Sequence, residues 1–120
     1  MGRVDNIMDL LEAGVRGESL RQKVIASNIA NIETPGYRRK GVRFEELLTK
    51  AVNSKGQVKA SEVSPEIYQP RQTKVKANGN DVSLEVEIGE MIKNALRQKT
   101  YIRLLSKKYR QIEAAITTRD

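Results

Sequence analysis

The feature that most constrains the fold is an apolar heptad pattern in the last third of the chain. Apolar residues recur there with alternating spacings of four and three, which predicts one long amphipathic helix with a narrow apolar stripe. The preceding Asn78-Gly79-Asn80-Asp81 supplies a turn and a choice of N-cap side chains, so the helix would begin near residue 81 or 82 and extend to Ile116. It would be about 53 Å long, which is far more than a compact chain of this size uses for one helix. The stripe consists of Leu84, Ile88, Met91, Ala95, Gln98, Ile102, Leu105, Tyr109, Ile112 and Ile116.

A second helical stripe is predicted near the N-terminus, over residues 3 to about 32. The polar side chain of Glu18 interrupts this stripe, and Gly14 and Gly17 each cost about 1 kcal/mol of helix propensity relative to alanine. We therefore expect a bend or a frayed region near residues 14 to 19. The apolar members of the stripe are Val4, Met8, Leu11, Val15, Ile25, Ile29 and Ile32.

The segment between the two helices contains too few apolar side chains to fold as a unit of its own. A short helix is predicted from Phe44 to Val52, where apolar residues recur at helical spacing. Residues 57 to 79 are expected to be irregular to weakly β, because Pro65 and Pro70 restrict any strand to a sheet edge.

These segments predict a mainly α protein in which two long terminal amphipathic helices form a coiled-coil-like pair. The division is an N-terminal helix at 1–33, a turn, short helix and extended or irregular segment at 34–80, and a C-terminal heptad helix at 81–120. The two terminal helices would form one packing unit. Narrow stripes are compatible with an intramolecular hairpin, with pairing between copies of the chain, or with both. The length of the middle segment argues against a simple hairpin.

The composition argues against an enzyme. The chain has no cysteine and no histidine, which removes thiol nucleophiles, imidazole catalysis and the usual zinc ligands. Carboxylate pairs remain at Glu45-Glu46 and Glu85-Glu87, but side chains one or two residues apart point to different sides of a helix. We expect both pairs to be solvated, and we expect no catalytic, metal or cofactor site. No apolar run is long enough to span a bilayer, and the N-terminal pattern is not that of a cleaved signal peptide.

The net charge of +7 is concentrated at residues 97 to 120. A smaller basic cluster, Arg38-Arg39-Lys40 with Arg43, lies beside Tyr37 and Phe44, and basic side chains interleaved with aromatic ones are typical of nucleic-acid-binding surfaces. No known nucleic-acid-binding motif accompanies it, and the basic side chains of the last helix are scattered around that helix. A basic coiled-coil adaptor or a nucleic-acid-binding protein is therefore the alternative function.

The end of the first helix has a distinctive sequence, Ser27-Asn28-Ile29-Ala30-Asn31-Ile32-Glu33-Thr34-Pro35-Gly36-Tyr37. Pro35 ends the helix by about residue 33, and Pro35-Gly36 fits the centre of a type II turn with positive φ at Gly36. Asn28 and Asn31 share one helical face. Either their amides bond across an interface or to the carbonyls of the helix end, or Asn31 is a local cap and Asn28 is solvated.

This string resembles the motif shared by bacterial flagellar axial proteins, which are rod, hook and hook-filament junction components. Two further stretches are similar to a short proximal-rod member of that superfamily. They are Gly79-Asn80-Asp81-Val82-Ser83-Leu84-Glu85, and Ala95-Leu96-Arg97 followed by Tyr101-Ile102-Arg103-Leu104-Leu105-Ser106-Lys107-Lys108-Tyr109 with Ile112, Ala115 and Ile116. A sibling proximal-rod protein typically carries a Ser-Arg-x-Tyr-type block, where this chain has Lys99-Thr100-Tyr101.

The resemblance implies a non-enzymatic structural subunit of the periplasmic proximal rod, exported through the flagellar type III apparatus without a cleaved signal peptide. The implied partners are copies of the chain, other flagellar rod proteins, the rod-to-ring adaptor, and membrane-ring and export-gate proteins, with no nucleic acid. On assembly the terminal helices would order into a tube. The expected assembly interface combines the two stripes with the asparagines of the motif: Val4, Met8, Leu11, Val15, Ile25, Asn28, Ile29, Asn31, Ile32, Leu84, Ile88, Met91, Ala95, Ile102, Leu105, Tyr109, Ile112 and Ile116, next to the turn motif Thr34, Pro35, Gly36 and Tyr37.

Overall fold

A computed structural model describes residues 3–118, with the side chains of residues 7–118. It is an elongated molecule with extents of 68 × 28 × 15 Å. The prediction of a mainly α fold with a weakly β middle segment is confirmed. The elements along the chain are α1 (Arg3–Ala30), β1 (Gly41–Arg43), α2 (Glu45–Asn53), the 3-10 helix η1 (Ala60–Glu62), β2 (Glu66–Tyr68) and α3 (Leu84–Thr117).

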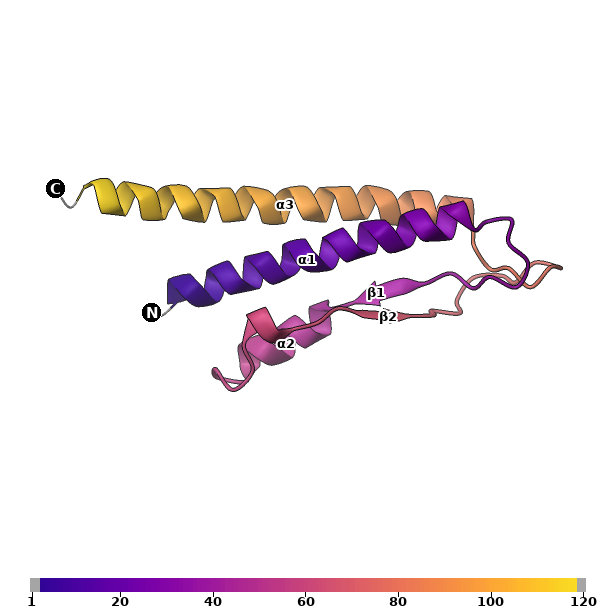
Figure 1. The fold of residues 1–120 in the computed structure, drawn as a ribbon, viewed down its shortest axis with the longest axis horizontal. Coiled ribbons are helices and arrows are strands. Elements are labelled where there is room, and N and C mark those ends of the chain that lie inside the picture. The colour runs from indigo at the N-terminus through magenta and orange to yellow at the C-terminus, as the bar shows by residue number, and fades with distance from the viewer. Residues whose placement is uncertain (1–2, 119–120) are drawn as a thin grey trace.

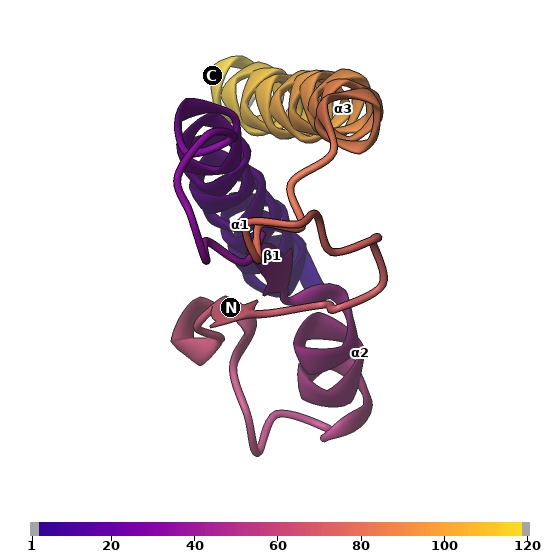
Figure 2. The same ribbon diagram turned by 90° about the vertical axis from the view of Figure 1, so that its right-hand side faces the viewer.

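The two terminal helices lie side by side and run in opposite directions (Figure 1). The middle segment folds back along α1, on a different side of this helix from α3, so that α1 lies between the two (Figure 2). The predicted coiled-coil-like pair is therefore present. In addition, the middle segment packs on α1 and forms a second layer of the structure.

Helix α3 begins at Leu84, later than the predicted start near residue 81 or 82. Its N-cap is Ser83, whose side chain accepts a hydrogen bond from the backbone N–H of Val86. The expected cap residues have other partners, because the side chains of Asn80 and Asp81 bind the segment that follows α1.

Helix α1 is unbroken from Arg3 to Ala30, and the expected bend or frayed region near residues 14 to 19 is wrong. Both glycines in this region permit close packing of aromatic rings. The ring of Tyr101 from α3 occupies the space that a Cβ atom on Gly14 would need. A Cβ atom on Gly17 would lie 2.5 Å from Cε1 of Phe44. Contacts with two other segments thus offset the low helix propensity of these positions.

The apolar core of the described chain lies between α1 and the middle segment. It is built from Ala13, Val24, Val42, Phe44 and Leu48. Strands β1 and β2 form a two-stranded antiparallel sheet in which Val42 pairs with Ile67. This small core fixes the middle segment on α1 and leaves the contact between α1 and α3 to other side chains.

Candidate assembly surfaces and their polar supports

The turn that follows α1 has the predicted form. The N–H of Tyr37 donates to the carbonyl of Thr34 at 3.2 Å, and Gly36 has a φ of +75°. The N–H of Gly36 also donates to the carbonyl of Asn78 at 2.9 Å, which joins the turn to the segment before α3.

Asn80 strengthens this connection. Its side-chain amide is fully buried and donates to the carbonyls of Asn31 and Thr34 at 2.9 and 2.8 Å. Next to it, Gly79 has a φ of +86°, and a Cβ atom there would lie 3.3 Å from the Cα atom of Gly36. The end of α1 and the start of α3 are therefore held together by a compact pair of loops.

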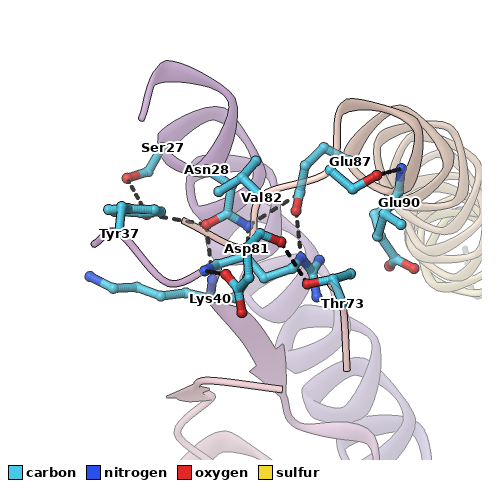
Figure 3. Close-up of polar contacts among 12 residues, drawn as sticks. Ser27, Asn28, Tyr37, Lys40, Thr73, Asp81, Val82, Glu87 and Glu90 are labelled. Atoms are coloured by element: carbon cyan, nitrogen blue, oxygen red, sulfur yellow. Dashed lines mark hydrogen bonds and ion pairs between the residues drawn. The ribbon is translucent and has the colours of Figure 1, made fainter. Parts of the chain in front are cut away.

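Asn28 uses its amide fully. The side chain is completely buried, and its Nδ2 atom donates to the carbonyl of Lys40 at 2.8 Å and to Oε2 of Glu87 at 3.1 Å (Figure 3). Its Oδ1 atom accepts hydrogen bonds from the Tyr37 hydroxyl at 3.1 Å and from the N–H of Lys40 at 2.9 Å. Asn28 thus connects α1, the turn, the segment leading to β1, and α3, and the interpretation that it is solvated is wrong.

Asn31 acts at the end of its own helix, which both interpretations allowed. Its amide donates to the carbonyl of Ser27 at 2.8 Å, and its Oδ1 atom accepts a hydrogen bond from the hydroxyl of Thr34 at 3.0 Å. It therefore satisfies a carbonyl at the end of α1 and fixes the first residue of the turn.

Glu87 lies in the first turn of α3, where this helix meets the end of α1 and the segment that follows it. Its side chain is fully buried, and its Oε1 atom accepts a hydrogen bond from Nε of Arg39 at 2.6 Å. The expectation that the carboxylates of Glu85-Glu87 are both solvated is therefore wrong for Glu87. The neighbouring Asp81 is also buried, and it accepts a hydrogen bond from the N–H of Arg39 and lies 3.6 Å from Nη1 of Arg38.

A second set of buried polar side chains lies further along the two helices. The Asn94 amide donates to the carbonyl and Oε1 of Glu18 at 2.8 and 3.0 Å. The guanidinium of Arg21 donates to both carboxylate oxygens of Glu18, to the carbonyl of Val42, and to Glu45. These contacts join α3, α1 and the beginning of α2.

The electrostatics of the pair formed by Arg21 and Glu45 favour the charged form of both side chains. Partial burial by itself raises the pKa of Glu45, but hydrogen bonds from the N–H of Glu45 and from Arg21 outweigh it, so that this pKa is lowered. Burial lowers the pKa of Arg21, and its contacts with Glu45 and Glu18 outweigh that effect and raise it. Both side chains therefore remain ionised near neutral pH.

The basic cluster at residues 38 to 43 is largely occupied by contacts within the chain. Arg39 is buried against Glu87, and Arg38 lies near Asp81. The guanidinium of Arg43 lies 4.2 Å from the centre of the Tyr68 ring. Lys40 and Arg43 remain exposed, so Arg39 is the member of the cluster that is fully withdrawn from solvent.

The predicted stripe of α3 faces away from α1 over most of its length. Gln98, Leu105 and Ile112 are half-buried, and Gln98 donates to the hydroxyl of Ser19 at 3.2 Å. The other positions of the stripe remain exposed in the single chain, so the predicted pairing of the terminal helices within one chain covers only part of the stripe. The exposed positions are Leu84, Ile88, Met91, Ala95, Ile102, Tyr109 and Ile116.

The stripe of α1 is more deeply covered. Leu11 and Ile25 are buried, whereas Met8, Val15, Ile29 and Ile32 are half-buried. The side chain of Val4 lies outside the described side chains. The hydroxyl of Tyr109 donates to Oε1 of Glu12 at 3.3 Å, which joins the stripe of α3 to α1.

Sequence reasoning missed the buried polar residues between the helices. One signal was available, because Glu18 interrupts the apolar stripe of α1 at a position that should face its neighbour. The other was the spacing of Glu87 and Asn94, which are one heptad apart and adjacent to the apolar stripe of α3.

Two kinds of site are not found in the described part of the chain. No described helix is both long and apolar enough to cross a bilayer. Among the described residues there is also no group of three or more carboxylate, histidine or cysteine side chains placed to hold a metal ion.

Comparison with known proteins gives one consistent result. Residues 14–38, which include the whole turn motif, match the family described as Flagella basal body rod protein. The chain is 27% identical to the flagellar basal body rod protein FlgB of Bacillus subtilis over 116 residues, which cover 89% of this chain and 90% of that protein. It is 30% identical to FlgB of Borreliella burgdorferi over 96 residues, covering 65% and 71% of the two chains, and 28% identical to FlgB of Aeromonas hydrophila over 101 residues, covering 75% and 76%. The chain therefore belongs to the FlgB family of flagellar basal body rod proteins.

Proposed function

We propose that this protein is a non-enzymatic structural subunit of the proximal rod in the flagellar basal body. Family membership supports the rod role, and nothing in the comparisons supports the alternative of a basic adaptor or a nucleic-acid-binding protein. We place the subunit in the periplasm and propose that it is exported without a cleaved signal peptide.

The observation that carries the proposal is the exposed apolar stripe of α3. Ile102 is 47% exposed and Ile116 is 66% exposed, although both belong to a heptad pattern that normally faces another helix. Burying such side chains contributes about 25 cal/mol for each Å² of apolar surface removed from water. A subunit with this stripe is therefore stabilised by neighbours that cover it.

The shape of the molecule favours an open assembly. The terminal helices form one packing unit, in which α3 has 34 residues and is about 51 Å long. The stripe of one subunit would contact a different surface of the next. Repeated contacts between unlike surfaces generate a helical array rather than a closed dimer. The proposed neighbours are copies of the chain, other rod proteins, the rod-to-ring adaptor, and membrane-ring and export-gate proteins.

The experiment compares two substitutions on exposed positions of α3. Ile102→Asp introduces a charge into the stripe, and Gln111→Asp introduces the same charge on an exposed position outside it. Both proteins should unfold at nearly the same urea concentration, because neither side chain is buried. Only Ile102→Asp should lose incorporation into isolated basal bodies and abolish motility.

Normal motility and normal rods with Ile102→Asp would contradict the proposed interface. The role itself is tested separately by deletion of the gene. Basal bodies from the deletion strain should lack rods, and intact rods in that strain would overturn the proposed function.

A further inference from the structure

The C-terminal half of α3 carries a large unbalanced positive charge. Residues 97–117 contain six basic side chains and only one acidic side chain, Glu113. Except for Lys108, which is half-buried, the basic residues are exposed. No salt bridge among the described side chains involves any of the six, which are Arg97, Lys99, Arg103, Lys107, Lys108 and Arg110.

Three of these charges border the apolar stripe. Lys99, Arg103 and Arg110 each directly follow a residue of the stripe, and successive residues in an α-helix are about 100° apart. They therefore form a row along one edge of the stripe. The row lies on the part of α3 that is distant from the loops joining the two helices (Figure 1).

A second copy packed in register does not supply a matching surface. Within residues 97–117 the only acidic side chain is Glu113, and the exposed Glu85 and half-buried Glu90 lie near the opposite end of α3, whereas Glu18, Asp81 and Glu87 are buried. The chain as a whole has a net charge of +7, so copies packed in register would bring like charges together. Like charges across a helical interface oppose association.

We infer that the C-terminal half of α3 docks an amphipathic helix of a different protein, whose apolar stripe is bordered by acidic side chains. Apolar residues at alternating spacings of four and three fit a helical partner, and charges next to such a stripe select the partner in coiled coils. The stripe contains no tryptophan or phenylalanine, which favours a helix over a lipid surface. This inference rests on the proposed function, since it assigns a partner to part of the same stripe.

The test uses the full chain and two labelled synthetic helices of about four heptads. Both have leucine in the stripe, and they differ only in having glutamate or glutamine at the flanking positions. Fluorescence anisotropy should give about tenfold tighter binding of the glutamate helix at low salt, and the difference should shrink as the salt concentration rises.

Charge-reversal variants test which basic residues cause the preference for the glutamate helix. Arg103→Glu together with Arg110→Glu should remove the preference for the glutamate helix. Lys74→Glu together with Lys76→Glu makes the same change in net charge on exposed residues of the middle segment and should keep the preference. Circular dichroism checks that both variants retain the helix content of the parent protein.

Three results would overturn the inference. They are equal affinity for the two synthetic helices, an equal loss of preference in the Lys74 and Lys76 variant, and tighter binding of duplex DNA or anionic phospholipid vesicles than of the glutamate helix. If any of these occurs while the gene-deletion strain still lacks rods, the partner assignment fails and the proposed function stands.

Discussion

The two sides of α3 have opposite characters. The side that faces α1 carries the buried polar residues Glu87 and Asn94, whereas the neighbouring side carries the exposed apolar residues Ile88 and Met91. This is the reverse of an ordinary amphipathic helix on a globular protein, which buries its apolar face. Under the proposed function, the contact within the subunit supplies specificity, and the exposed apolar side chains are available for contacts between subunits.

Polar contacts fix the alignment of α3 along α1, because a hydrogen bond forms only at particular distances and angles. Asn28 meets Glu87 at one level of the helix pair, and Asn94 meets Glu18 at another. A shift of α3 along α1 by one turn would leave these buried groups without partners, which is costly in a poorly hydrated environment. Apolar side chains alone would tolerate such a shift more easily.

The largest effect on stability is expected from Glu87→Ala on the inner side of α3. The substitution leaves the guanidinium of Arg39 and the amide of Asn28 buried without their partner, which should lower the free energy of unfolding by about 3–5 kcal/mol. Urea denaturation measures this, and Ile88→Ala on the outer side is the control, with an expected loss below about 1 kcal/mol. Equal losses would contradict the difference between the two sides.

A smaller effect is expected from Asn94→Ala. The backbone carbonyl of Glu18 and its carboxylate each lose a buried hydrogen bond, so the free energy of unfolding should fall by about 1–3 kcal/mol. The adjacent exposed Lys93 provides a control, because Lys93→Ala should change the same quantity by less than about 0.5 kcal/mol. The contact has no structural role if the two variants are equally stable.

Two glycine substitutions should change the stability of the protein in opposite directions. Gly17→Ala places a Cβ atom against the ring of Phe44 and should destabilise the protein by about 1–3 kcal/mol despite the better helix propensity of alanine. Gly89→Ala on α3 meets no atom within 4 Å and should stabilise it by about 0.5–1 kcal/mol. Thermal unfolding followed by circular dichroism measures both shifts, and stabilisation by Gly17→Ala would contradict the close contact with Phe44.

The smallest expected effect is the pH dependence of the contribution that Glu45 makes to stability. Because the pKa of Glu45 is lowered in the folded protein from its ordinary value of 4.5, its ionised form stabilises the fold above that pH. This contribution is lost as the pH falls through the lowered pKa of the folded state. The difference in unfolding free energy between the parent protein and Glu45→Gln should therefore be constant near neutral pH and shrink below 4.5. A difference that persists unchanged into acid would exclude this role.

Much of the architecture was predictable because it depends on local spacing. The heptad pattern of α3 predicted a single long helix, and Pro35-Gly36 predicted the turn. The glycines at 14 and 17 were misinterpreted, because helix propensity describes an isolated helix and takes no account of the rings of Tyr101 and Phe44.

The sequence by itself determined the two long helices, the position of the turn after α1 and the apolar stripe of α3, since each follows from residues close together in the chain. Only the tertiary structure decided which side of each helix faces the other. Periodicity gives the direction of the apolar side chains around a helix, but it does not say whether the same chain or a neighbour covers them. Likewise, Glu87 is tolerated in the interior only because Asn28 and Arg39, far away in the sequence, bring hydrogen-bond donors to it.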